Sequence, residues 1–193
     1  TSGHHNIAWE LYRDERFDPT RGTLDRLLAE LDRSGAERAV ISAEDLEFLG
    51  VYPEALAGFD EKLRLAGWKP TYLVYFRKAE SYVVSLYGTL RARRKIRANF
   101  VAFLFSFLRQ GWFSVGPEFY ELSRRRFCER WRAVTGKDAL VTVDFDESTG
   151  EGGPVVRFLQ IAGIDDPALL AAARDTPAVN RGKRRRLPKL IMR

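Results

Sequence analysis

The feature that most limits the fold is a short apolar run, Thr71-Tyr72-Leu73-Val74-Tyr75-Phe76, which lies between two segments with helical spacing. A nearly continuous apolar run of this length is typical of a strand that is covered on both faces, as in a parallel sheet. Parallel neighbours need a long crossover connection, which is usually a helix. The run therefore predicts an α/β protein in which helices flank a parallel sheet.

Two more apolar, β-branched runs predict further strands of the same sheet, at residues 38–42 and 139–143. The intervening segments carry apolar residues at helical spacing. Helices are predicted from Leu24 to Gly35, from Pro53 to Ala66, around Val83–Leu90 and Phe100–Leu108, from Pro117 to about Val134, after Pro154, and from Ala168 to Arg174. Three strands are few for a sheet of this kind.

The composition of the 193 residues fits one globular domain, with 45% hydrophobic and 30% charged residues. The single cysteine, Cys128, excludes an intrachain disulfide. With only two histidines beside it, the chain has too few ligands for a structural zinc site, and we expect no metal. No apolar run is long enough to span a bilayer and no signal peptide is recognisable, so we expect a cytoplasmic protein.

The net charge of +6 comes from the C-terminal end of the chain. Residues 181–193 carry seven basic and no acidic side chains, whereas residues 1–180 carry 25 basic and 26 acidic ones. We therefore predict a domain over residues 1–180 followed by a basic tail. A neutral domain does not favour nucleic-acid binding. The tail could contact phosphates or the inner membrane surface, and a solvated terminus is the alternative.

Candidate functional residues follow each predicted strand, at the edge where open α/β sheets bind their ligands. They are Ser42, Glu44 and Asp45 after the first strand, Arg77, Lys78 and Ser85 after the second, and Asp144, Asp146 and Glu147 after the third. A cation and a hydroxyl that face a carboxylate suit an anionic ligand together with a general base. The alternative is that these residues only cap helices and solvate loops.

Nucleotide-binding loops of the Gly-x-x-x-x-Gly-Lys-Ser/Thr type are absent from the sequence. Thr135-Gly136-Lys137 precedes a predicted strand and indicates the end of a helix. Gly150-Glu151-Gly152-Gly153 follows a strand, but its glutamate would repel a phosphate. His4 and His5 would diverge on a helix, so one of them at most could serve a site, and a surface or capping role is equally compatible.

The segment from Tyr75 to Tyr87 resembles the 3′-phosphate-binding segment of sulfotransferases that use 3′-phosphoadenosine 5′-phosphosulfate. An arginine, Arg77, ends the predicted strand, and a serine, Ser85, follows on the next helix. The resemblance implies that these two side chains hold the 3′-phosphate, a role that suits a guanidinium fork and a hydroxyl. Other segments similar to bacterial sulfotransferase-like proteins are residues 2–11, 41–45 and 117–143, so that the resemblance covers residues 2–180.

One part of the family pattern has no counterpart here. The family begins with a strand and a Lys-x-Gly-Thr-Thr loop that binds the 5′-phosphosulfate, and in the family this strand lies centrally in the sheet. We therefore expect a P-loop-NTPase-like sheet that lacks a central strand, with a gap between the strands at 71–76 and 139–143. Either an N-terminal segment precedes Thr1 or the protein has lost the loop.

The resemblance implies transfer of a sulfuryl group from 3′-phosphoadenosine 5′-phosphosulfate to a hydroxyl or amine of a carbohydrate or lipid-linked glycan. Such a reaction depends on in-line positioning and charge neutralisation. We expect Glu44 to be the general base, with His5 as the second candidate. In a competing interpretation, Glu44 and Asp45 lie in the first turn of a helix through Leu49. Two alternative functions are another nucleotide-dependent transferase or kinase and a non-catalytic binding protein.

Overall fold

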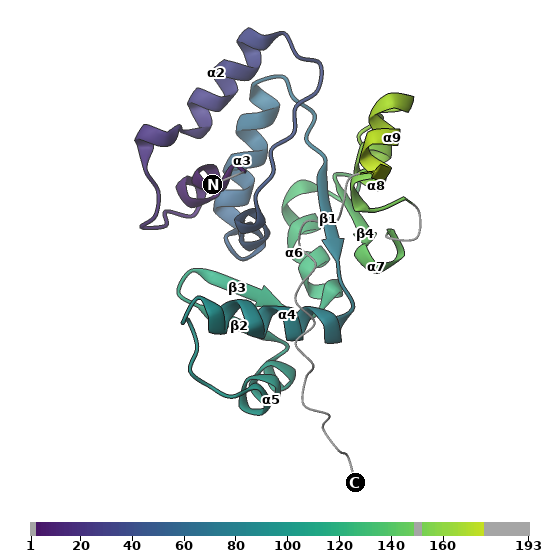
Figure 1. Ribbon diagram of the computed structural model, residues 1–193. Coiled ribbons are helices and arrows are strands. Elements are labelled where there is room, and N and C mark those ends of the chain that lie inside the picture. Colours follow the sequence, from purple (N-terminus) through teal and green to yellow (C-terminus); the bar gives the residue numbers. More distant parts are fainter. Residues whose placement is uncertain (1–2, 149–151, 176–193) are drawn as a thin grey trace. The chain divides into compact units, whose positions relative to one another are not determined.

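A computed structural model describes residues 3–148 and 152–175 of the chain (Figure 1). The chain divides into two compact units, with the boundary between Val143 and Asp144. The first unit contains α1 (His5–Leu11), the 3₁₀ helix η1 (Pro19–Arg21), α2 (Leu24–Ser34), the 3₁₀ helix η2 (Glu44–Val51), α3 (Pro53–Leu65), β1 (Tyr72–Phe76), α4 (Ala79–Ala92), α5 (Phe100–Gln110), β2 (Trp112–Val115), β3 (Glu118–Glu121), α6 (Arg124–Thr135) and most of β4 (Leu140–Asp144). The second unit contains α7 (Phe145–Ser148), α8 (Pro154–Ile161) and α9 (Pro167–Asp175). The predicted basic tail lies outside the described residues.

The helices predicted from apolar spacing form where a start or stop signal accompanies that spacing. In α2, the side chain of Thr23 accepts a hydrogen bond from the backbone N–H of Arg26. Gly35 then ends the helix in the left-handed conformation, with φ of 62°. The same two devices bound α5, where the Asn99 side chain accepts from the N–H of Ala102 and Gly111 closes the last turn.

Two of the three predicted strands are confirmed, and they are parallel neighbours in a small sheet. β1 and β4 are paired directly, and the N–H of Tyr72 donates to the carbonyl of Ala139 at 2.7 Å. The predicted gap between these two strands is therefore wrong, because no further strand fits between hydrogen-bonded neighbours. Every residue of β1 is half-buried, so this strand is less covered than its apolar sequence indicates.

The predicted strand at residues 38–42 is wrong, because this segment has no regular structure and is largely exposed. Val40 keeps 51% of its surface in contact with solvent. The backbone of Ser42 is already occupied by the N-terminal segment. Its carbonyl accepts from the N–H of His4 at 2.7 Å, and its N–H donates to Nδ1 of His4 at 3.1 Å. β-Branched residues thus failed to form a strand where no sheet neighbour was available.

The predicted helix from Pro117 to Val134 is also wrong in its first part. β2 and β3 form an antiparallel hairpin whose register pairs Trp112 with Glu121 and Val115 with Glu118. A two-residue turn joins the strands, and Gly116 supplies the positive φ of 58° that such turns need. The helix begins only at Arg124, after Ser123 caps it. Gly116 and Pro117 therefore mark a hairpin turn and not a helix start.

Gly50 provides a test of the packing in the first unit. A Cβ atom at Gly50 would lie 2.6 Å from Nε1 of Trp131, whose buried ring stacks on Phe127. We expect Gly50→Ala to lower the free energy of unfolding by about 1–3 kcal/mol because this ring has no room to move. Gly58→Ala on α3, where nothing lies within 4 Å of the added methyl, should raise it by about 0.5–1 kcal/mol. Urea unfolding of both variants checks the prediction, which fails if the two changes have the same sign.

Candidate functional site

The first candidate site lies where α1 contacts η2. Nδ1 of His5 is 3.1 Å from Oδ2 of Asp45, and the indole N–H of Trp9 donates to the same oxygen at 2.6 Å. Asp45 is buried, whereas the His5 side chain keeps part of its surface in solvent. A carboxylate bound to Nδ1 orients an imidazole and leaves Nε2 as the nitrogen that can accept a proton. The pair therefore has the arrangement of a general base with its orienting group.

Glu44, the predicted general base, is the first residue of η2 and is exposed. Both it and Asp45 lie in the first turn of this helix, as in the competing interpretation of the sequence. The carboxylate that contacts His5 belongs to Asp45. Asp45 follows Glu44, the predicted base, directly in the sequence. The sequence did not indicate that Asp45 contacts His5, because the two residues are 40 positions apart.

A second set of charged side chains surrounds Glu118 on β3, whose side chain is only 1% exposed. Its carboxylate accepts hydrogen bonds from Nζ of Lys95, from Nη1 of Arg16 at 3.4 Å and from the hydroxyl of Tyr120 at 2.7 Å. Burial raises the pKa of Glu118, but the hydrogen bonds and the charges of Lys95 and Arg16 outweigh burial and lower it. The carboxylate is therefore held ionised by two cations.

Arg16 connects this set to the His5–Asp45 pair. Its guanidinium lies over the Trp9 ring, 4.7 Å from the ring centroid, and also makes a two-bond contact with Asp14 at 2.7 and 2.8 Å. We use the name buried polar network for the side chains that these contacts join: His5, Trp9, Asp14, Arg16, Asp45, Lys95, Glu118 and Tyr120. The network draws on four separate stretches of the chain, which explains why no local motif reveals it.

Two further acidic groups lie close to the buried polar network. The hydroxyl of Tyr12 is buried and has no hydrogen-bond partner in the described part of the chain. Burial, followed by the negative charge of Asp45, raises the pKa of Tyr12. Glu47 on η2 retains contact with solvent, yet withdrawal from water and the charges of Glu44 and Asp45 raise its pKa to about 8.

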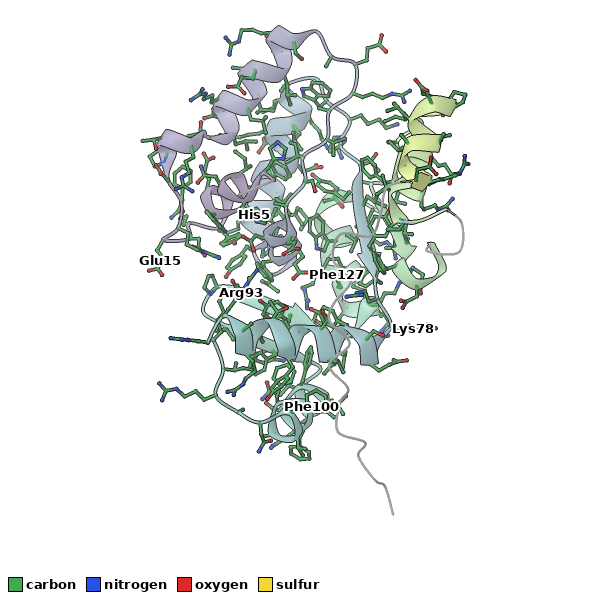
Figure 2. The ribbon with its side chains drawn as sticks, in the orientation of Figure 1. His5, Glu15, Lys78, Arg93, Phe100 and Phe127 are labelled. Atoms are coloured by element: carbon green, nitrogen blue, oxygen red, sulfur yellow. The ribbon has the colours of Figure 1, made fainter. Side chains whose placement is uncertain are left out.

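The second pair of candidate residues lies on the β1–α4 connection. Arg77 directly follows the last residue of β1, Lys78 is the N-cap of α4, and Ser85 lies within that helix. The predicted order of strand, arginine, helix and serine is therefore present, and Arg77 and Ser85 are both exposed. Figure 2 shows His5 and Lys78 well apart in the first unit. His5 and Glu44 therefore lie on α1 and η2, which contact each other, whereas Arg77 and Ser85 follow one another in the chain from the end of β1 into α4.

The acidic residues after the third predicted strand lie at the start of the second unit. Oδ1 of Asp144 accepts a hydrogen bond from the backbone N–H of Asp146 at 3.0 Å, which is a local turn contact. This contact is the capping role that the sequence analysis left open for such residues. The first two residues of Gly150-Glu151-Gly152-Gly153 lie outside the described residues.

The described part of the chain and three comparisons with known proteins limit the type of site. Within residues 3–148 and 152–175, no group of three His, Cys, Asp or Glu side chains could hold a metal ion. No helix in the same ranges is long and apolar enough to cross a membrane. Comparisons with protein-family models, with curated proteins and with solved structures found no match to the chain. The comparisons therefore assign the chain to no family.

Proposed function

We propose that the chain is a sulfotransferase-like protein with a P-loop-NTPase-like sheet, which binds 3′-phosphoadenosine 5′-phosphosulfate and transfers its sulfuryl group to a hydroxyl or amine of a carbohydrate or glycolipid. The observation that carries the proposal is the place of Arg77, at the carboxyl end of a strand that has a parallel neighbour. Open α/β sheets bind ligands at this edge. Ser85 on the following helix adds a hydroxyl donor to the same connection.

In the proposed complex, Arg77 and Ser85 hold the 3′-phosphate of the nucleotide. The planar guanidinium can bind two phosphate oxygens at once, and the hydroxyl can donate to a third. These contacts would distinguish a nucleotide with a 3′-phosphate from one that carries phosphate only at the 5′ position.

The proposed transfer needs a base for the acceptor. The acceptor oxygen or nitrogen attacks sulfur, the bond from sulfur to the 5′-phosphate oxygen breaks, and adenosine 3′,5′-bisphosphate leaves. The acceptor proton passes to the base. Of the two candidates from the sequence, His5 is favoured over Glu44, because Asp45 orients the His5 ring and Trp9 fixes the Asp45 carboxylate. Because His5 lies well apart from Lys78, the neighbour of Arg77, the proposal requires the 5′-phosphosulfate and the acceptor to lie nearer to α1 than the 3′-phosphate does.

Nucleotide binding tests the proposal. We expect calorimetry to show that adenosine 3′,5′-bisphosphate binds more tightly than adenosine 5′-monophosphate. Arg77→Ala should weaken binding of the bisphosphate about tenfold or more, because a hydrogen bond to a charged group contributes about 1.5–3 kcal/mol. Arg33→Ala on α2 is the control, since this exposed arginine contacts only the carbonyl of its own helix at Ala29 among the contacts of the described residues.

Four results would go against the proposal. Equal affinity for the two nucleotides, or equal binding by the Arg77→Ala and Arg33→Ala variants, would overturn the assignment of the 3′-phosphate site. Preferential binding of ATP would favour the kinase alternative. Transfer itself is measured with a ³⁵S-labelled donor and a panel of sugar acceptors, and binding without transfer would favour the non-catalytic alternative.

A further inference from the structure

α5 carries apolar residues on both its buried and its solvent-facing sides. Phe103 and Phe107 face the core and are almost fully buried. On the other side, Val101, Phe105 and Leu108 are 62%, 69% and 60% exposed. These three positions are spaced four and three residues apart, so they form one stripe along the helix. A helix with apolar residues on all sides is normally buried on all sides, either in protein or in lipid.

The exposed stripe lies on a helix that is capped at both ends and packed against its neighbours. Asn99 caps its start and Gly111 closes its last turn. The ring of Phe103 contacts Phe113 on β2, with 5.0 Å between the ring centroids. Figure 1 shows α5 beside the β2–β3 hairpin, at one end of the first unit. The stripe is therefore presented to solvent by the folded structure.

An aromatic residue follows the helix along the chain, on the hairpin face opposite to Phe113, which packs on α5. Trp112, the first residue of β2, is 37% exposed. Its ring stacks on Phe119 of the neighbouring strand, with 5.3 Å between the centroids, which holds it in place. Tryptophan is enriched at the boundary between lipid and water because its ring is apolar and its N–H is polar. We use the name α5 face for Val101, Phe105 and Leu108, and Trp112 is the tryptophan nearest to it along the chain.

The charged residues next to α5 along the chain, from residue 91 to residue 117, all have one sign. Residues 91–117 contain no acidic side chain. They contain six basic ones, which are Arg91, Arg93, Arg94, Lys95, Arg97 and Arg109. Lys95 is engaged with Glu118, and the five arginines are exposed. An apolar helix face with arginines next to it along the chain is the pattern of helices that lie in the surface of an anionic membrane.

We propose that the α5 face docks this protein on a membrane that contains anionic phospholipids. The apolar stripe enters the boundary between headgroups and acyl chains, and the arginines next to it along the chain pair with lipid phosphates. A second copy of the chain is a poorer occupant, because a symmetric contact would bring two sets of arginines together. The proposal is independent of the sulfotransferase function, since it uses no residue of the β1–α4 connection.

Vesicle co-sedimentation tests the proposal with the full chain. We expect binding to vesicles of phosphatidylglycerol and phosphatidylcholine at low salt, weaker binding at high salt, and no binding to phosphatidylcholine alone. The double variant Phe105→Ser/Leu108→Ser should bind at least tenfold more weakly. Leu65→Ser is the matched control, because Leu65 on α3 is also a solvent-facing leucine, at 81% exposure, and its loss should leave binding unchanged.

A second measurement covers the case in which the double variant fails to fold. Addition of anionic vesicles should shift the tryptophan emission of the parent to shorter wavelength, and Trp112→Phe should remove most of that shift. Absence of binding to anionic vesicles would overturn the proposal, as would equal binding by the double variant and the parent. Self-association that the double variant abolishes, without vesicle binding by the parent, would overturn it in favour of a second copy.

The basic tail needs its own control, because it could bind an anionic membrane independently of the α5 face. The full chain with Arg184→Ser, Arg185→Ser and Arg186→Ser removes three tail charges and leaves the α5 face intact. Binding that this tail variant retains and the double variant loses supports the proposal. Binding that the tail variant loses and the double variant retains would overturn it.

Discussion

Glu118→Ala should lower the free energy of unfolding by about 1–3 kcal/mol, because the charged hydrogen bonds of a buried carboxylate are lost, while the Lys95 and Arg16 side chains, 27% and 34% exposed, keep access to water. Glu118 is 1% exposed and binds Lys95, Arg16 and the Tyr120 hydroxyl. Its loss would leave the ammonium group of Lys95 without the carboxylate that it contacts. Urea unfolding at pH 7 measures the effect.

Glu129→Ala is the matched control for that experiment. Glu129 on α6 also forms an ion pair, with Arg125 at 3.7 Å, but both side chains are largely exposed. Exposed pairs of this spacing contribute about 0.3–0.5 kcal/mol. A loss in Glu118→Ala no larger than the loss in Glu129→Ala would show that the buried contacts do not stabilise the fold.

The pH dependence of the Glu118 variants follows from its lowered pKa. A carboxyl whose pKa is lower in the folded than in the unfolded state stabilises the fold above the unfolded pKa. That stabilisation is lost as the pH falls through the folded pKa. The difference in stability between the parent and Glu118→Gln should therefore be largest at neutral pH and should narrow in acid.

His5→Ala should lower the turnover of sulfuryl transfer about 10²- to 10⁴-fold, which is the usual cost of losing a general base. This prediction depends on the proposed function. The Nδ1 contact with Asp45 orients the ring, so Asp45→Asn should also lower turnover while it leaves nucleotide affinity unchanged. Initial rates with a labelled donor, together with calorimetry on the same variants, separate catalysis from binding.

Glu44→Gln distinguishes the two candidate bases. Glu44 lies next to Asp45 on η2, but it is exposed. We expect near-normal turnover in this variant and a small change in melting temperature, as for a charge in the first turn of a helix. If Glu44→Gln loses activity and His5→Ala keeps it, Glu44 is the base and the His5–Asp45 pair only joins α1 to η2.

Local sequence signals predicted some elements correctly and one helix start wrongly. Thr23 and Gly35 bound α2 as expected, and the apolar run at 71–76 forms β1. The segment at 38–42 has the composition of a strand, but a strand also needs a neighbour, and composition does not specify one. Pro117 was predicted to start a helix but lies in the turn between β2 and β3, because proline suits both the first turn of a helix and a tight turn between strands.

The candidate site was predictable only in part for the same reason. His5, Glu44, Arg77 and Ser85 stand out from their positions near predicted strand ends or in the N-terminal segment. The contact of His5 with Asp45 and the burial of Glu118 arise from tertiary packing, which spacing along the chain does not encode. The helix predicted from Pro117 placed Glu118 in a first helical turn, where an acidic residue is ordinary, so its burial was not expected.

The pairing of β1 with β4 has a consequence for the order of folding. The two strands are neighbours in space, but α4, α5, the β2–β3 hairpin and α6 all lie between them in the chain. Closing so long a loop in an unstructured chain costs entropy before any contact is gained. The hairpin, with only Gly116 and Pro117 between its strands, closes at little cost. Local elements therefore form first and shorten the effective loop, and the parallel pair completes the first unit late.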